Sequence, residues 1–172
     1  MIWNMNAHEK ITDDAFKFIK AHKVELIEKF VQGNKPPADV LPTTVFMAGC
    51  PGAGKTEFSK RLIEKLGAAV RIDADEIREF CPGYTGDNAH LFQKAASKGV
   101  NMLYDYVLLN KINAIMDGTF AYSEAIQNIE RSLKKGRTTE IMFVLSRSST
   151  GLGIYKKKRR IRKKTCYQRN LC

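Results

Sequence analysis

One segment of the sequence carries the residue types that bind phosphate groups. It reads Gly49-Cys50-Pro51-Gly52-Ala53-Gly54-Lys55-Thr56 and matches the pattern GxxxxGK[ST] at every fixed position. Glycines allow backbone N–H groups to turn inward around a phosphate, and the N-terminus of a following helix adds partial positive charge. The lysine of this pattern reaches the β- and γ-phosphates, and the threonine hydroxyl binds Mg²⁺. The segment therefore predicts a site for ATP and Mg²⁺, with Lys55 as a catalytic residue and Thr56 as a metal ligand.

The elements expected around this segment suit such a site. An apolar run over residues 44–48 predicts a buried strand directly before it, and a helix is expected over residues 55–65. Further strands are expected over residues 69–72, 114–116 and 140–145, and further helices over residues 75–80, 87–107 and 123–135. Because strands alternate with helices, we expect an α/β fold of the P-loop NTPase type, with a mostly parallel sheet flanked by helices.

Acidic residues follow the ends of two predicted strands. Asp73 and Asp75 follow the strand over residues 69–72, and Asp117 follows the strand over residues 114–116. Ligands of open α/β sheets bind beyond the carboxyl ends of the strands, so these carboxylates are expected beside the phosphate-binding segment. A carboxylate there can accept a proton from a substrate hydroxyl or hold Mg²⁺. The alternative for Asp75 is a helix cap, and Asp73 is more typical of a structural or metal-binding role.

The N-terminal part of the chain is expected to form one amphipathic helix over residues 12–31. Its large apolar side chains fall on one stripe, and burying each of them is worth roughly 1.5–3 kcal/mol, so the helix should pack on the rest of the chain. We expect three segments: an N-terminal helical segment and linker over residues 1–40, a P-loop core over residues 41–145, and a basic tail over residues 146–172.

The net charge of +11 is concentrated in the tail. Residues 141–172 contain ten of the 29 lysines and arginines and no acidic residue. A nucleic-acid-binding role would have to rest on this tail alone, so nucleic acid is not the expected partner. No apolar run approaches the length of a membrane span, no signal-peptide pattern is present, and the four cysteines form no CxxC motif. We therefore expect a cytoplasmic protein without a membrane partner.

Together these residues resemble the zeta toxin family of P-loop kinases. The matching segments lie within residues 40–145: GCPGAGKT, then RIDADEIRE, a long helix, and IMDGT. The resemblance implies transfer of the γ-phosphate of Mg·ATP to the 3′-hydroxyl of the sugar in UDP-N-acetylglucosamine. It implies that Asp75 is the base that activates this hydroxyl and that Asp117 and Thr119 contact the amino sugar.

Two positions depart from the pattern of the family. Asn101, which we also assign to the substrate site, falls where the family usually has an acidic contact, and Ala121 falls where an arginine is common. The alternatives are a kinase for another small hydroxyl substrate and a nucleotide-binding protein without turnover. The family also implies an antitoxin partner. The N-terminal helix could instead inhibit in cis by covering the nucleotide site.

The tail departs furthest from the family, which continues with a helical lid whose arginines stabilise the transferred charge. Residues 146–172 show no apolar periodicity, and we hypothesise that they are a frameshift product that replaces the lid. A functional basic tail is the alternative. Arg159, Arg160 and Arg162 have no apolar stripe to dock them, so we expect residues beyond Ser148 to pack poorly and this chain to phosphorylate slowly.

Overall fold

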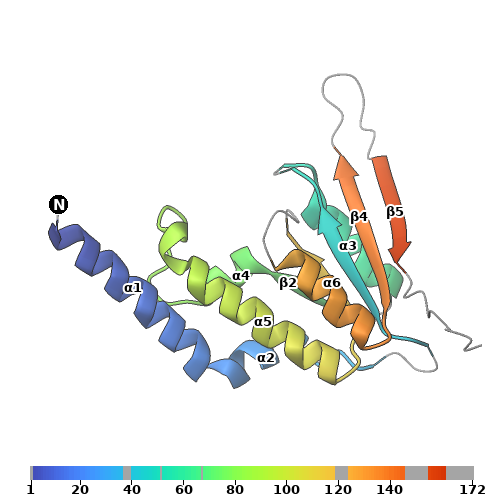
Figure 1. Cartoon of the computed structure of the whole chain (residues 1–172), viewed down its shortest axis with the longest axis horizontal. Coiled ribbons are helices and arrows are strands. Elements are labelled where there is room, and N and C mark those ends of the chain that lie inside the picture. The colour runs from blue at the N-terminus through green and yellow to red at the C-terminus, as the bar shows by residue number, and fades with distance from the viewer. Residues whose placement is uncertain are drawn as a thin grey trace, which may run out of the picture.

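The computed structural model describes residues 2–36, 40–50, 52–66, 68–118, 124–145 and 155–161 (Figure 1). Five strands form one sheet in the order β2-β3-β1-β4-β5. Their bounds are β1 Thr43–Ala48, β2 Val70–Asp73, β3 Ala114–Asp117, β4 Thr138–Leu145 and β5 Tyr155–Ile161. The first four strands are parallel, and β5 is antiparallel to β4. The expected α/β fold with a mostly parallel, helix-flanked sheet is confirmed.

Both faces of the sheet are covered by helices, which explains the nearly continuous apolar runs in its strands. Helix α3 (Lys55–Leu66) packs on one face, and α5 (Gln93–Leu109) and α6 (Ala125–Lys134) lie on the other (Figure 1). Successive side chains of a strand point to opposite faces. Val45 and Met47 of β1 therefore belong to the cluster under α3, whereas Phe46 belongs to the cluster under α5.

The N-terminal region forms two helices, α1 (Ile2–Ala21) and α2 (Lys23–Val31), so the expectation of one helix over residues 12–31 is wrong. The break lies at His22, whose ring stacks on Phe18 and whose Nδ1 donates a hydrogen bond to Phe18 O at 2.9 Å. This contact caps the last turn of α1. The expected packing is confirmed, because Ile19 and Leu26 are fully buried and Asp13 pairs with Lys94 of α5.

Two short helices connect β2 to α5. They are α4 (Ala74–Glu79) and the 3₁₀ helix η1 (Ala89–Phe92), and α5 follows η1 directly. The long helix expected from residue 87 therefore begins with a 3₁₀ turn. A Cβ added at Gly99 of α5 would lie 2.6 Å from Ile77 Cγ2 of α4. Glycine at this position thus sets how closely α5 approaches α4.

The C-terminal segment of the described chain corrects the expectation that residues beyond Ser148 pack poorly. Residues 155–161 pair along their whole length with β4, from Tyr155 beside Leu145 to Ile161 beside Thr139. The edge of β4 offers unpaired backbone N–H and C=O groups, and pairing with them does not require apolar side chains. Arg162 and the rest of the tail lie outside the described residues. Among the described helices, none is both long and apolar enough to cross a membrane.

Candidate nucleotide and acceptor site

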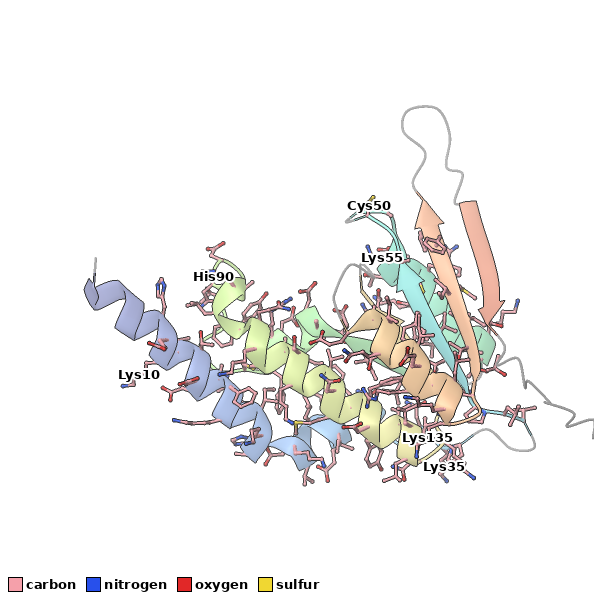
Figure 2. The ribbon with its side chains drawn as sticks, in the orientation of Figure 1. Lys10, Lys35, Cys50, Lys55, His90 and Lys135 are labelled. Carbon is pink, nitrogen blue, oxygen red and sulfur yellow. The ribbon has the colours of Figure 1, made fainter. Side chains whose placement is uncertain are left out.

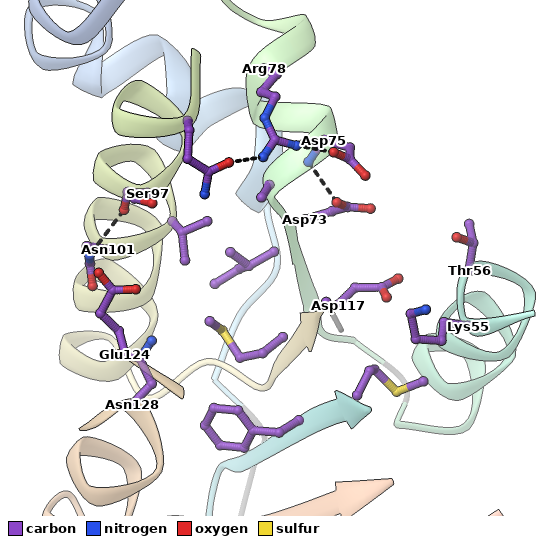
Figure 3. Close-up of a pocket in the computed structure, with 18 of the residues that line it drawn as sticks. Lys55, Thr56, Asp73, Asp75, Arg78, Ser97, Asn101, Asp117, Glu124 and Asn128 are labelled. Carbon is purple, nitrogen blue, oxygen red and sulfur yellow. Dashed lines mark hydrogen bonds and ion pairs between the residues drawn. The ribbon is translucent and has the colours of Figure 1, made fainter. Parts of the chain in front are cut away.

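A pocket of about 750 Å³ lies at the carboxyl ends of β1, β2 and β3 (Figure 3). The start of α3 forms one wall, and α4, α5 and α6 form the opposite wall. The described site residues predicted from the sequence that line this pocket are Gly52, Gly54, Lys55, Thr56, Asp73, Asp75, Asn101 and Asp117. Gly49, Cys50 and Ala53 belong to the same loop but do not line it. Pro51 and Thr119 lie outside the described residues.

The loop between β1 and α3 has a backbone that requires glycine. Gly52 and Gly54 have φ values of +74° and +78°, a region that other residues rarely adopt. Gly49 has a φ of +151°, and a Cβ there would lie 2.4 Å from Val144 O of β4. The loop therefore passes directly against the neighbouring strand, and the fixed glycines of the sequence pattern have a physical reason.

Lys55 and Thr56 open α3 at the edge of this loop (Figure 3). Lys55 Nζ donates hydrogen bonds to Gly49 O at 3.1 Å and to Cys50 O at 2.7 Å, so its ammonium group lies against the loop. Cys50 is exposed, and Figure 2 shows it at the outer tip of the loop. The first N–H groups of a helix have no partner inside the helix, so this end can bind an anion.

Asp73 and Asp117 end neighbouring strands and lie opposite one another in the β2–β3 register. Arg71, which the sequence analysis did not single out, contacts both of them. Its Nε donates to Asp117 Oδ2 at 2.7 Å, and its Nη2 donates to Asp73 Oδ2 at 2.5 Å. Ser59 of α3 also donates to Asp117 Oδ2, at 2.9 Å. The alternation of side chains along a strand was a usable signal, because Arg71 and Asp73 share one face of β2.

Asp73, rather than Asp75, caps helix α4. Its Oδ1 accepts the backbone N–H of Asp75 at 2.9 Å, which excludes the alternative that Asp75 serves as the cap. Burial raises the pKa of Asp73 to about 6, against the hydrogen bond from Asp75 and the charge of Arg71, which both lower it. Asp73 is therefore a tightly bound, partly desolvated carboxyl group.

The carboxylate of Asp75 is exposed and stands on the other wall of the pocket. It forms an ion pair with Arg78, whose guanidinium also donates to Gln93 Oε1 of α5 (Figure 3). Arg78 Nε is buried and has no hydrogen-bond partner among the described residues. Arg78 thus links the α4 carboxylate to α5, a role that no spacing in the sequence indicated.

The wall formed by α5 and α6 carries amide side chains that one arginine holds. Arg131 Nη1 donates to Asn101 Oδ1 at 3.2 Å and to Asn128 Oδ1 at 2.6 Å. The Arg131 guanidinium lies 4.9 Å from the centre of the Tyr104 ring and pairs with Asp105. Sequence analysis found only Asn101 of this network. Gln93 and Ser97, which also line the pocket, lie four residues apart and then four from Asn101, so helical periodicity could have found them.

The N-terminal helices do not form part of the pocket. Among the described residues that line it, none belongs to α1 or α2, which pack instead on α5 and η1. The two helices therefore leave the pocket uncovered in this arrangement, which is against the suggestion that they inhibit in cis by covering it.

Comparisons with known proteins place this geometry in a family. A family model described as zeta toxin matches residues 28–164, which extends past the motifs within residues 40–145 and includes β5. The ATPase subunit HslU of an ATP-dependent protease from Petrotoga mobilis is 36% identical over 67 residues, which cover 38% of this chain and 14% of that protein. This relative shares a short segment only.

One solved structure shows a similar fold. A structure from the PezAT chromosomal toxin–antitoxin system of Streptococcus pneumoniae has a TM-score of 0.67 and 20% sequence identity. The match covers 76% of this chain and 57% of that one. A chain of the Pnkp1/Rnl/Hen1 complex has a TM-score of 0.44 and 17% identity over 77% of this chain and 50% of that one. Because the family match includes most of the chain and every residue that lines the pocket, the protein belongs to the zeta toxin family of kinase-like P-loop proteins.

Proposed function

We propose that the protein is a kinase that transfers the γ-phosphate of Mg·ATP to a hydroxyl group of a UDP-amino sugar, with UDP-N-acetylglucosamine as the expected substrate. The observation that carries the proposal is the pair of opposite walls in one pocket. A phosphate-binding loop forms one wall, and an exposed carboxylate among hydrogen-bonding side chains lies on the other. Phosphoryl transfer depends mainly on positioning the two reactants and neutralising charge, and this arrangement supports both.

The loop wall suits a polyphosphate. The backbone at Gly52 and Gly54 has the conformation that turns N–H groups toward a bound anion, and a Cβ at Gly52 would meet no atom within 4 Å. Lys55 would leave the Gly49 and Cys50 carbonyl oxygens to contact the β- and γ-phosphates. The α3 N-terminus adds partial positive charge at the same place.

The donors beside the loop suit Mg²⁺, which neutralises phosphate charge when it is bound with ATP. Thr56 and Asp73 supply a hydroxyl and a carboxylate, the hard oxygen ligands that Mg²⁺ prefers. Within the part of the chain that the structure describes, no three acidic, histidine or cysteine side chains form a metal cluster. This fits Mg²⁺, which usually uses one or two carboxylates and completes its shell with phosphate oxygens and water.

On the opposite wall, Asp75 is the candidate base. Its carboxylate would accept the proton of the substrate hydroxyl as the hydroxyl oxygen attacks the γ-phosphorus. Arg78 holds this carboxylate at the edge of the pocket. Asn101, Asn128 and Ser97 offer neutral hydrogen-bonding groups, which suit the hydroxyl and amide groups of an amino sugar. Asp117 lies between Lys55 and this wall (Figure 3), so we assign it a contact to the sugar.

The test is an ATP-consumption assay over a set of UDP-sugars with the wild-type chain, Asp75→Asn and Glu79→Gln. Asp75→Asn keeps the shape of the side chain but cannot take up the proton. It should lower turnover by roughly 10²-fold or more while Mg·ATP affinity, measured by calorimetry, stays near the wild-type value. Glu79 is an exposed residue of the same helix outside the pocket, so Glu79→Gln should behave as wild type. Wild-type ATP consumption that no UDP-sugar stimulates would contradict the proposed acceptor.

A second candidate is a nucleotide-binding protein without turnover. The family pattern implies a helical lid after β4, whereas residues 155–161 of this chain form strand β5. Without arginines that a lid holds at the γ-phosphate, transfer would lose a contribution of about 10³–10⁵ in rate. In the same assay this candidate predicts normal Mg·ATP affinity together with no acceptor-dependent release of ADP.

We also propose an antitoxin protein as the partner. The family is named for its toxins, and the solved PezAT structure comes from a toxin–antitoxin system. Growth arrest on expression of this chain, relieved by co-expression of a neighbouring gene product, would support this partner. Expression without any effect on growth would point instead to the candidate without turnover.

A further inference from the structure

Arg71 is a half-buried cation that contacts three carboxylates and does not itself line the pocket. Besides its hydrogen bonds to Asp117 and Asp73, its Nη1 forms an ion pair with Glu76. The Arg71 side chain is 10% exposed, and those of Asp73 and Asp117 are 16% and 4% exposed. A guanidinium group offers five donors in a fixed plane, so it can hold several carboxylates in one geometry.

The sheet brings these groups together. Arg71 and Asp73 lie two residues apart on one face of β2, and Asp73 lies opposite Asp117 in β3. Arg71 itself lies opposite Ile115, so its side chain reaches Asp117 diagonally across the two strands. Two partly desolvated carboxylates side by side repel each other. The guanidinium between them offsets this repulsion and fixes their separation.

The contacts also set the orientation of the Asp117 carboxylate. Its Oδ2 accepts two hydrogen bonds, one from Arg71 Nε in β2 and one from Ser59 Oγ in α3. Ser59 lies one turn after the start of α3, and its Oγ also lies 2.9 Å from Thr56 O. Oδ1 has no hydrogen-bond partner among the described residues, and the Asp117 side chain is directed toward Lys55 (Figure 3). The Asp117 carboxylate is therefore held on the side of the pocket where Lys55 lies, and Oδ1 keeps its capacity to accept a hydrogen bond from a ligand.

We propose that Arg71 is a positioning residue that clamps Asp73, the expected metal ligand, and Asp117 at the ends of neighbouring strands, and so holds both carboxylates at the phosphate end of the pocket. The inference rests on the proposed nucleotide site. It adds that the affinity for Mg·ATP depends on Arg71, whereas the affinity for metal-free ATP, which is bound by the loop, does not. Arg71 has no contact with the loop, and its contact with α4 is made through Glu76, which does not line the pocket. Its influence on the pocket therefore passes through the two strand-end carboxylates.

The test compares calorimetric titrations of ATP with EDTA and ATP with Mg²⁺ for the wild-type chain and Arg71→Gln. Loss of a side chain that orients metal ligands typically costs 10–100-fold in metal affinity or activity, so Mg·ATP binding should weaken by about tenfold or more. ATP in EDTA should bind with unchanged affinity, because the loop is untouched. Arg71→Lys, which keeps the charge but not the planar fork, should recover part of the loss.

Glu76→Gln is the matched control. It removes the third partner of Arg71 without touching the strand-end carboxylates, and Glu76 does not line the pocket, so both titrations should match wild type. Ser59→Ala removes the other hydrogen bond to Asp117 Oδ2 and leaves no buried charge unpaired, so it should show the same selective loss of Mg·ATP binding on a smaller scale. If Arg71→Gln does not fold, Ser59→Ala carries the test.

Three results would overturn the inference: unchanged Mg·ATP binding in Arg71→Gln, an equal loss of binding with and without Mg²⁺, or a Ser59→Ala variant indistinguishable from wild type. A wild-type chain that binds no ATP would instead refute the proposed function. In that case crystal structures of the wild-type chain and Arg71→Gln still decide, because the inference requires the Asp117 carboxylate to turn away from Lys55 in the variant. An Asp117 side chain in the same orientation in both would contradict it.

Discussion

The two walls of the pocket are built from different parts of the polypeptide. The loop wall is a main-chain structure, in which three glycines with positive φ set the path of the backbone. The acceptor wall is made of side chains, and arginines hold them in place: Arg78 binds Asp75 and Gln93, and Arg131 binds Asn101. Phosphate recognition therefore depends on local chain geometry, whereas acceptor recognition depends on contacts between separate helices.

The two walls should differ in how well they tolerate substitution of their side chains. A side chain of the loop that points outward, such as Cys50, can vary without altering the N–H groups that face a phosphate. A side chain of the acceptor wall has a partner in another element, and its loss leaves that partner unpaired. If the two walls are independent, a substitution in one wall should change binding of one reactant and leave binding of the other unchanged.

The largest effect is expected at Lys55, the one side chain on which the loop wall depends for charge. Lys55→Ala removes an ammonium group that stabilises transferred charge, and loss of one such donor costs about 10²–10³-fold in turnover. Mg·ATP affinity should fall as well, which calorimetry measures. Lys60→Ala, an exposed position of the same helix, serves as the control. Unchanged nucleotide affinity in Lys55→Ala would mean that the loop is not the phosphate site.

A smaller and selective effect is expected on the acceptor wall. Arg131→Gln frees the Asn101 and Asn128 amides, so the acceptor should bind less well and its KM should rise by about tenfold, which corresponds to about 1.4 kcal/mol. The affinity for Mg·ATP should not change. Lys134→Gln, an exposed position of α6, is the matched control. If Arg131→Gln weakened ATP binding instead, the two walls would not be independent.

The close packing of α4 on α5 predicts that a larger side chain at Gly99 lowers the free energy of unfolding. In Gly99→Ala the new methyl group would meet Ile77 Cγ2 at 2.6 Å, and overpacking of this kind costs about 1–3 kcal/mol in the free energy of unfolding. Denaturant titration measures the loss. The double variant Ile77→Ala/Gly99→Ala should lose less than the sum of the two single variants, because the shorter side chain makes room. Additive losses would show that Gly99 is not a packing constraint.

Most of the fold and the loop wall could be predicted from the sequence because their signals are local. The apolar run over residues 44–48 and the glycines at 49, 52 and 54 lie within one short segment, and each predicts its own conformation. Asp73, Asp75 and Asp117 could be placed in the pocket because the carboxyl ends of parallel strands meet at one edge. The arginines that hold the side chains of the site were not predicted.

The contacts that join separate elements could not be predicted, because they connect residues that are far apart in the chain. Arg71 reaches Asp117, and Arg131 reaches Asn101, and the spacing of such pairs carries no periodic signal. The break at His22 depends on a side chain that binds the carbonyl group of the preceding turn. Strand β5 was missed because apolar periodicity was the criterion, whereas the pairing of Tyr155–Ile161 with β4 uses the backbone.

The smallest effect is expected at Cys50, which tests whether the loop wall really acts through its backbone. Cys50 is exposed at the outer tip of the loop, whereas Cys81 is buried, and burial raises the pKa of the Cys81 thiol to about 11. At pH 8 Cys81 therefore holds little thiolate, the form that reacts, and its thiol also lies out of reach of the reagent. A small methanethiosulfonate reagent, which transfers a methylthio group to a thiolate and releases a sulfinate, should modify Cys50 and spare Cys81, as peptide mass spectrometry would show.

The modified chain should bind Mg·ATP with an affinity within about threefold of the unmodified one, because the added group leaves the backbone N–H groups of the loop in place. A threefold change corresponds to less than about 1 kcal/mol. The experiment uses the Cys166→Ser/Cys172→Ser background, because these two cysteines lie outside the described residues. Cys50→Ser, which the reagent cannot modify, is the control. If the added group abolished nucleotide binding, the loop would recognise phosphate through the surroundings of its side chains, and the contrast between a backbone wall and a side-chain wall would fail.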